Sequence, residues 1–138
     1  MSSDTSRMIH VVCANDTMEF LSSRWGPPLM GNENVKLPVY SWDEMDEGKA
    51  QALQAAANLQ FTFHGYRDCS LESGPSAFAS FDGSYCEVPV EPSGGGRCIV
   101  PLDEHGRPCD RELTAAHRYL MMKMKIEAAL SALVSHMH

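Results

Sequence analysis

The sequence predicts an α+β fold, with a single layer of three to five mostly antiparallel strands and two helices packed on one face. Three observations favour this class. Asp110–Met137 is the longest segment without Gly or Pro and is rich in helix formers. From Gln60 onward the apolar residues recur with a period of two, as in strands. Asp82-Gly83 is the residue pair that a two-residue hairpin turn prefers.

At 138 residues, the chain has the length of one domain with one core. We expect residues 1–7 to form a disordered start and the Gly-rich residues 91–96 to form a flexible connection. The apolar, β-branched run Met8–Ala14 predicts a central strand. Residues 15–25 fit either a capped helix or a returning strand, and the strand or an irregular segment is favoured. Residues 26–34 predict a loop, because Gly, Pro and Asn interrupt regular structure there.

A helix is predicted over Ser41–Leu59. Ser41 and Glu44 have the spacing of a capping box, in which each side chain satisfies a free backbone donor of the first turn. Four carboxylates crowd this start, where the helix dipole favours negative charge. They are Asp43, Glu44, Asp46 and Glu47.

Alternating residues after Gln60 predict a strand with Phe61, Phe63 and Gly65 on one face. The Asp82-Gly83 turn pairs Phe81 with Ser84 and fixes the register of the following hairpin. This register separates a more apolar face from a mixed one. The apolar face, which we expect to meet the core, holds Ala77, Ala79, Phe81, Cys86 and Val88, and the mixed face holds Phe78, Ser80, Tyr85 and Glu87.

The last part of the chain predicts a short strand over 97–102, a turn over 103–108, and a helix with Asp110 as its N-cap. One stripe of this helix should face the core, since its apolar residues recur at steps of three and four. A second apolar side exceeds what one sheet face can cover, and we expect it to form a symmetric homodimer. Its residues are Leu113, Leu120, Met121 and Met124.

The net charge of −7 is unevenly distributed along the sequence. Residues 1–96 carry a balance of −8 and residues 97–138 a balance of +1. An acidic surface repels the phosphate backbone, so direct nucleic-acid binding is disfavoured. No apolar run reaches the roughly 20 residues that cross a bilayer, and the start lacks the pattern of a secretory signal. We therefore expect a cytoplasmic protein that does not enter membranes.

Neither the cysteines nor the histidines form a convincing site. Five cysteines without paired spacing argue against a disulfide framework, and we expect reduced thiols without metal. The residues Cys98, His105, Cys109 and His117 lack the close Cys pair of a structural zinc site. An enzyme with His64 as base and Cys69 as nucleophile is the alternative function, although nothing in the spacing requires it.

These features predict a small acidic binding or inhibitory protein that docks on a basic surface of another macromolecule. The expected binding residues are Asp43, Glu44, Asp46 and Glu47. Their charges would attract a basic protein and make its affinity depend on salt. In composition the chain is comparable with small acidic inhibitors of nucleic-acid-binding proteins that phages and other mobile elements encode. No cofactor is expected.

Overall fold

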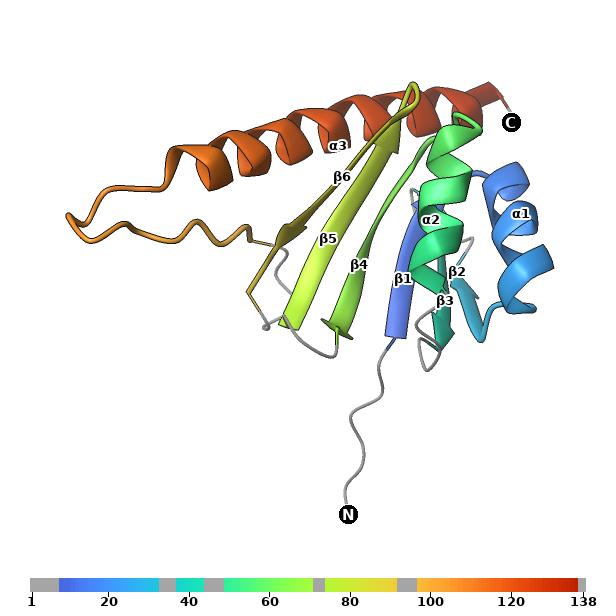
Figure 1. Cartoon of the computed structure of the whole chain (residues 1–138). Helices are drawn as coiled ribbons and strands as arrows, with labels where there is room; N and C mark the ends of the chain where they lie inside the picture. The colour runs from blue at the N-terminus through green and yellow to red at the C-terminus, as the bar shows by residue number, and fades with distance from the viewer. Residues whose placement is uncertain (1–7, 33–36, 44–48, 71–73, 92–96, 137–138) are drawn as a thin grey trace, which may run out of the picture.

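The computed structural model describes residues 8–32, 37–43, 49–70, 74–91 and 97–136 (Figure 1). Most of the predicted disordered start and Gly-rich connection lies outside these residues. The fold is α+β, with one antiparallel sheet in the order β2-β3-β1-β4-β5-β6. Within these residues the sheet has six strands and is accompanied by three helices, so both counts exceed the prediction. The elements are β1 (Met8–Cys13), α1 (Asn15–Trp25), β2 (Met30–Asn32), β3 (Val39–Asp43), α2 (Lys49–Asn58), β4 (Phe63–Ser70), β5 (Gly74–Phe81), β6 (Ser84–Pro89) and α3 (Asp110–His136).

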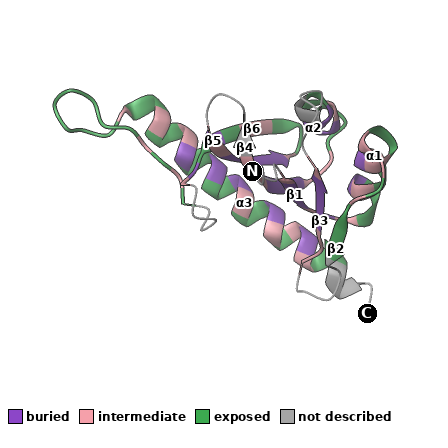
Figure 2. Cartoon of the chain, turned by 90° about the horizontal axis from the view of Figure 1, so that it is seen from below, coloured by how far each residue is buried: buried purple, intermediate pink, exposed green. Residues whose placement is uncertain are grey.

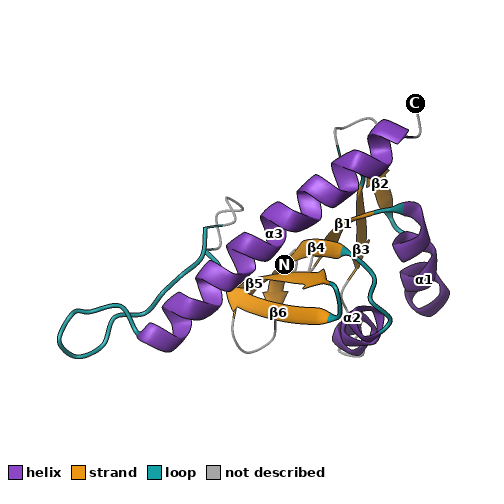
Figure 3. Cartoon of the chain, turned by 90° about the horizontal axis from the view of Figure 1, so that it is seen from above, coloured by secondary structure: helices purple, strands orange, loops and turns teal. Residues whose placement is uncertain are grey.

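Helices cover both faces of the sheet, whereas the prediction placed them on one. Figure 3 shows α3 on one side of the strands and α1 and α2 on the other. Two cores result, because each sheet face has its own apolar cover. The first core includes Ile9, Val11, Leu21, Tyr40, Trp42, Leu53, Phe63 and Phe78, and the second includes Ala77, Ala79, Val88, Tyr119, Met122, Ile126 and Leu130.

The predictions for the central strand and the hairpin are confirmed. β1 lies between β3 and β4 in the middle of the sheet. Phe81 pairs with Ser84, and both Asp82 and Gly83 have positive φ, as a type I′ turn requires. The face predicted as the better core face packs on α3, but Phe78 on the opposite face is also fully buried. Both faces of this hairpin therefore contribute to a core.

The preference for a strand over residues 15–25 is wrong, because this segment is helix α1. Thr17 and Leu21, four residues apart, are both buried. This helical spacing was present in the sequence, but the alternation of Met18 and Phe20 obscured it. The helix ends at Gly26, whose positive φ suits a chain reversal.

The predicted helix over 41–59 is wrong in its first part. Ser41 and Trp42 belong to strand β3, and α2 is described only from Lys49. Trp42 pairs with Ile9 on β1 and is buried among the side chains between the sheet and its helices. Pairing with two neighbouring strands therefore overrides the local capping signal.

The predicted strand over 97–102 is also wrong. The described residues there form only two isolated bridges, Val90 with Cys98 and Leu102 with Pro108. Pro101 and Pro108 lack the N–H that a regular ladder needs. The segment projects beyond β6 as an exposed loop (Figure 1). In contrast, β2 occupies part of the segment predicted as a loop.

The long helix predicted from Asp110 onward is confirmed as α3. Its first residue is Asp110, and Cys109 accepts the hydrogen bond of Leu113 N–H, so the cap lies one residue before the predicted one. Figure 2 shows buried and exposed residues alternating along the helix. Tyr119, Ile126 and Leu130 lie on the buried stripe. None of the helices within the described ranges is both long and apolar enough to cross a membrane.

Candidate functional site

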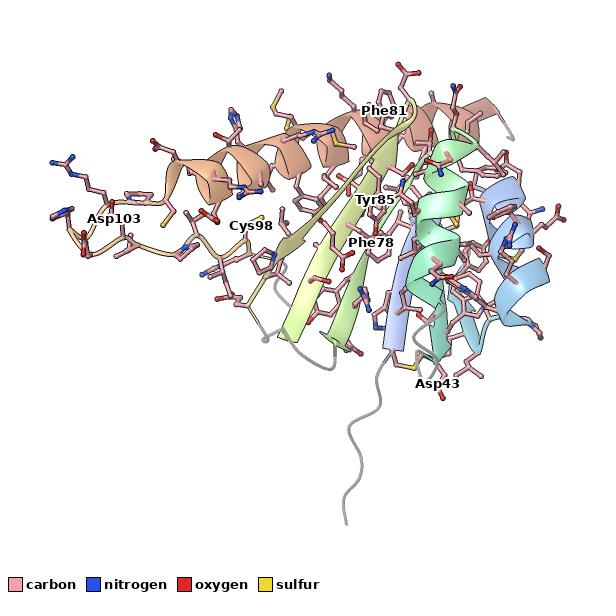
Figure 4. All side chains as sticks on the ribbon, in the orientation of Figure 1. Asp43, Phe78, Phe81, Tyr85, Cys98 and Asp103 are labelled. Atoms are coloured by element: carbon pink, nitrogen blue, oxygen red, sulfur yellow. The ribbon has the colours of Figure 1, made fainter. Side chains whose placement is uncertain are left out.

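One end of the sheet lies away from α3. This helix packs mainly on β5 and β6 and touches β4. Figure 4 shows Phe81 at the sheet end beside α3 and Asp43 at the opposite end. At that opposite end, the face that α3 partly covers carries Met8, His10, Ser41, Asp43, Tyr66 and Asp68, which we name the acidic sheet end.

Strand pairing places two carboxylates of the acidic sheet end in one row. Asp43 pairs with Met8 across β3 and β1. On the other side of β1, Ile9 pairs with Arg67 in the antiparallel register. The next residue of β4, Asp68, therefore lies beside Met8. Two strand spacings separate Asp43 from Asp68, a distance of about 10 Å. The two carboxylates can therefore meet two different basic side chains of a partner.

His10 connects the neighbouring row to this pair. Its Nδ1 lies 2.7 Å from Ser41 Oγ, and its Nε2 lies 3.4 Å from Asp68 Oδ2. Because a carboxylate only accepts, Nε2 carries the hydrogen and the Nδ1 of a neutral ring accepts from the Ser41 hydroxyl. Tyr66 stacks beside the imidazole with the ring centroids 6.2 Å apart. These contacts hold His10 and orient it toward Asp68.

Ser, His and Asp are the residue types of a hydrolase triad, but this geometry does not favour acyl transfer. Ser41 is only 5% exposed. Ser41 pairs with His10 on one side and with Met30 on the other. The backbone groups around it therefore take part in the pairing of the sheet. A serine nucleophile needs free N–H groups directed at the developing oxyanion. The arrangement instead presents the partly exposed His10 and Asp68 as polar contact groups.

Of the four acidic residues predicted to bind, the structure places one. Asp43 ends β3 in the acidic sheet end and is partly exposed. Glu44, Asp46 and Glu47 lie outside the described residues. The sequence did not indicate that His10, Ser41 and Asp68 belong to this site, because their proximity depends on the pairing of β1 with both β3 and β4. No spacing along the sequence signals that order.

A second polar cluster lies on the opposite face. Arg67 points there and donates from Nη1 to Glu87 Oε2 at 2.9 Å. Ser76 donates to the same carboxylate oxygen, and Tyr85 donates to Oε1. Burial, followed by the charge of Glu87, raises the pKa of Tyr85. Arg67 therefore meets Glu87 on this face, whereas the carboxylate of its neighbour Asp68 lies on the other face beside His10.

His64, the base of the alternative enzyme, lies beneath α3. It is buried, and its Nε2 lies 3.1 Å from Glu127 Oε2. Cys69 follows His64 by five positions in β4, which places their Cα atoms about 16 Å apart along the strand. Direct proton transfer between these two side chains would need a different backbone conformation. The side chain of Cys69 is outside the described part.

The pKa of His64 is lowered to about 4, chiefly by burial. The carboxylate of Glu127 opposes this shift by a smaller amount, and the charge of Lys123 adds to it. The unfolded chain therefore binds a proton on this residue between pH 6.5 and 4 that the folded chain does not. We expect stability to fall as pH drops through this window, by up to about 3 kcal/mol from this group. Urea unfolding at several pH values measures the loss.

The matched variant for this prediction is His64→Gln, which keeps a polar side chain but does not titrate. Its stability should change less between pH 6.5 and 4 than that of the wild-type chain. Carboxylates titrate near the lower limit in both proteins, so the comparison isolates His64. Equal pH profiles for the two proteins would contradict the assignment.

The candidate zinc ligands are separated in the structure. Cys98 packs against the α3 core, whereas His105 lies on the exposed loop beside Glu104. Within the described ranges, no three His, Cys, Asp or Glu side chains are placed to share a metal ion. Cys13, Cys86, Cys98 and Cys109 are free thiols.

Comparisons with protein families, curated proteins and solved structures find no match for this chain.

Proposed function

We propose that the chain is a small binding protein that docks its acidic sheet end on a basic surface of another macromolecule. The observation that carries the proposal is the placement of Asp43 and Asp68 on either side of Met8, at the end of the sheet away from α3. Both carboxylates are partly exposed. A partner's Lys or Arg side chains could reach them without unfolding any element.

Three further observations support a basic partner. The chain carries −7 overall, and the segment that follows Asp43 adds Glu44, Asp46 and Glu47 in sequence. Arg67 is paired on the opposite face. His10, held beside Asp68, supplies a polar ring at the centre of the surface. Charge of one sign at such a surface raises the association rate and favours partners of opposite charge.

The test uses an oligo-arginine peptide as the probe and fluorescence anisotropy as the readout. We expect Asp43→Asn combined with Asp68→Asn to weaken binding roughly tenfold at low salt, since each exposed ion pair is worth up to about 1 kcal/mol. The same double variant should show a shallower dependence of affinity on salt.

Asp82→Asn is the matched control. It removes one negative charge from the hairpin turn, as each of the single variants Asp43→Asn and Asp68→Asn does from the acidic sheet end, and Asn tolerates the positive φ there. That turn lies at the end of the sheet beside α3, far from Asp43. Equal losses in this control and in the single variants would show that net charge alone governs binding, and would contradict the proposed surface.

A further inference from the structure

The outer edge of β6 presents backbone groups that the sheet does not use. β6 is the last strand in the sheet order, and within the described ranges no strand pairs with the outer side of residues 84–88 (Figure 3). Val90 N–H donates to the carbonyl oxygen of Pro75 in the direction of β5. Because this direction alternates along a strand, Tyr85 and Glu87 point their N–H and C=O groups outward. An added extended strand could pair with these groups.

Prolines prevent the next segment of the chain from covering this edge. Ile99 N–H donates to the carbonyl oxygen of Pro89, so the segment begins an antiparallel pairing with β6. The next hydrogen-bonded pair of that ladder would join Glu87 with Pro101. Pro101 has no N–H and cannot donate to Glu87. The segment then leaves the sheet as the exposed loop (Figure 1).

Two contacts fix how α3 is turned above the sheet. Glu127 Oε2 lies 3.1 Å from His64 Nε2 of β4, and Met122 Sδ lies 3.5 Å from Cys86 Sγ of β6. The helix surface between Glu127 and Met122 therefore spans the strands from β4 to β6. The surface that continues past Met122 extends beyond β6, toward its outer edge.

This continuing surface of α3 is basic. Arg118 and Lys125 lie about 40° and 60° past Met122 around the helix, on the side away from β4. Both side chains are exposed. Burial raises the pKa of the Cys86 thiol, and the charge of Arg118 opposes this shift, in agreement with a guanidinium close to β6. Two cations therefore border the open edge on its α3 side.

The charges around the edge favour an acidic occupant. Glu87, the acidic side chain of β6, points to the other face of the sheet and pairs there with Arg67. A second copy of the chain joined edge to edge by β6 would place its own α3 on the same face, next to the first. Arg118 and Lys125 of the two copies would then face one another, and like charges repel.

We propose that the outer edge of β6 accepts a short extended segment of an acidic partner as an added strand, whose carboxylates meet Arg118 and Lys125. Bonds to the backbone of Tyr85 and Glu87 hold the strand, and the two cations select acidic side chains at alternate positions. The occupant is opposite in charge to the partner of the acidic sheet end. The two proposals can therefore fail independently.

The first test uses a fluorescein-labelled peptide of alternating Glu and Val as the probe. It should bind saturably at low salt in an anisotropy titration. When its Glu side chains face α3, the Val residues are those whose N–H groups face β6. A peptide of alternating Glu and Pro keeps the charge but lacks these donors, so it should bind far more weakly. Equal binding of the two peptides would overturn strand addition.

The second test locates the bound peptide by amide hydrogen exchange. The Glu–Val peptide should slow exchange at the amides of Tyr85 and Glu87, which point outward. The amide of Cys86 should change little, because it points to β5. Protection at other residues without protection at Tyr85 and Glu87 would contradict the proposed site. A dimer of the chain alone that already protects these two amides would assign the edge to a second copy and also overturn the proposal.

The third test concerns the two cations. Arg118→Gln and Lys125→Gln should each weaken binding of the Glu–Val peptide roughly threefold at low salt. Lys123→Gln is the matched control, because it removes one positive charge from the same helix on the side that faces His64. Its affinity should stay close to that of the wild-type chain. Equal losses in all three variants would show that net charge, not the edge, governs binding.

Discussion

Gly65→Ala should lower the free energy of unfolding by at least about 3 kcal/mol, a large part of the stability of a domain of this size. Gly65 lies in β4, opposite Val11 on one side and Phe78 on the other. A Cβ at this position would collide with the carbonyl oxygen of His10 and with the ring of Phe78. The carbonyl belongs to the central strand, which cannot move without disturbing its pairing with β3. Urea unfolding of the two proteins measures the loss.

Gly31→Ala is the control for a glycine in a strand. A Cβ there would lie 3.1 Å from Tyr40 Cδ1, so a side chain rather than the backbone has to yield. β2 is at the edge of the sheet, where such an adjustment is easier. We expect a loss below about 1 kcal/mol. If Gly65→Ala cost no more than Gly31→Ala, the close approach of β4 to β1 and β5 would be contradicted.

Trp42→Ala should destabilise the chain by about 3 to 5 kcal/mol, the cost of truncating a large buried aromatic. Trp42 is 1% exposed and contacts Trp25 of α1 edge-on at a centroid distance of 5.0 Å. Its indole N–H donates to the carbonyl of Gly26 at 2.9 Å. The substitution therefore removes packing from the first core and leaves the end of α1 without this hydrogen bond. Thermal unfolding should show the loss as a lower Tm.

Trp42→Phe separates these two contributions. It keeps most of the apolar packing and removes the donor to Gly26, so its cost should be nearer 1 kcal/mol, the usual net value of one hydrogen bond, plus a small packing loss. A tolerated Trp42→Ala variant would contradict the assignment of residues 39–43 to a buried strand.

Local sequence determines part of this fold. The Asp82-Gly83 turn needs only two residues that accept positive φ, and both have it. The long helix needs only its own apolar period and the absence of Gly and Pro. In contrast, Ser41 and Trp42 have a local capping signal, but they pair with residues more than thirty positions away on β1. The residues of this segment alone do not indicate how much that pairing stabilises the strand.

One part of the candidate site also follows from local sequence, whereas the rest depends on strand pairing. Asp43 was predicted from the density of carboxylates around it, which is a local property. His10, Ser41 and Asp68 come together only because β1 lies between β3 and β4. The sequence separations between these residues contain no motif from which that contact follows. The exposed apolar residues Leu113, Leu120, Met121 and Met124 of α3 agree with the sequence prediction that this helix has more apolar surface than one sheet face covers.

The central claim, that the acidic sheet end binds a basic surface, is tested most directly by an NMR titration of the labelled chain with the oligo-arginine peptide. Saturable amide shift changes should be largest at residues 8–10, 41–43 and 66–68, and they should shrink in the Asp43→Asn, Asp68→Asn variant. Changes centred on residues 113–124, or no saturable changes at low salt, would contradict the claim.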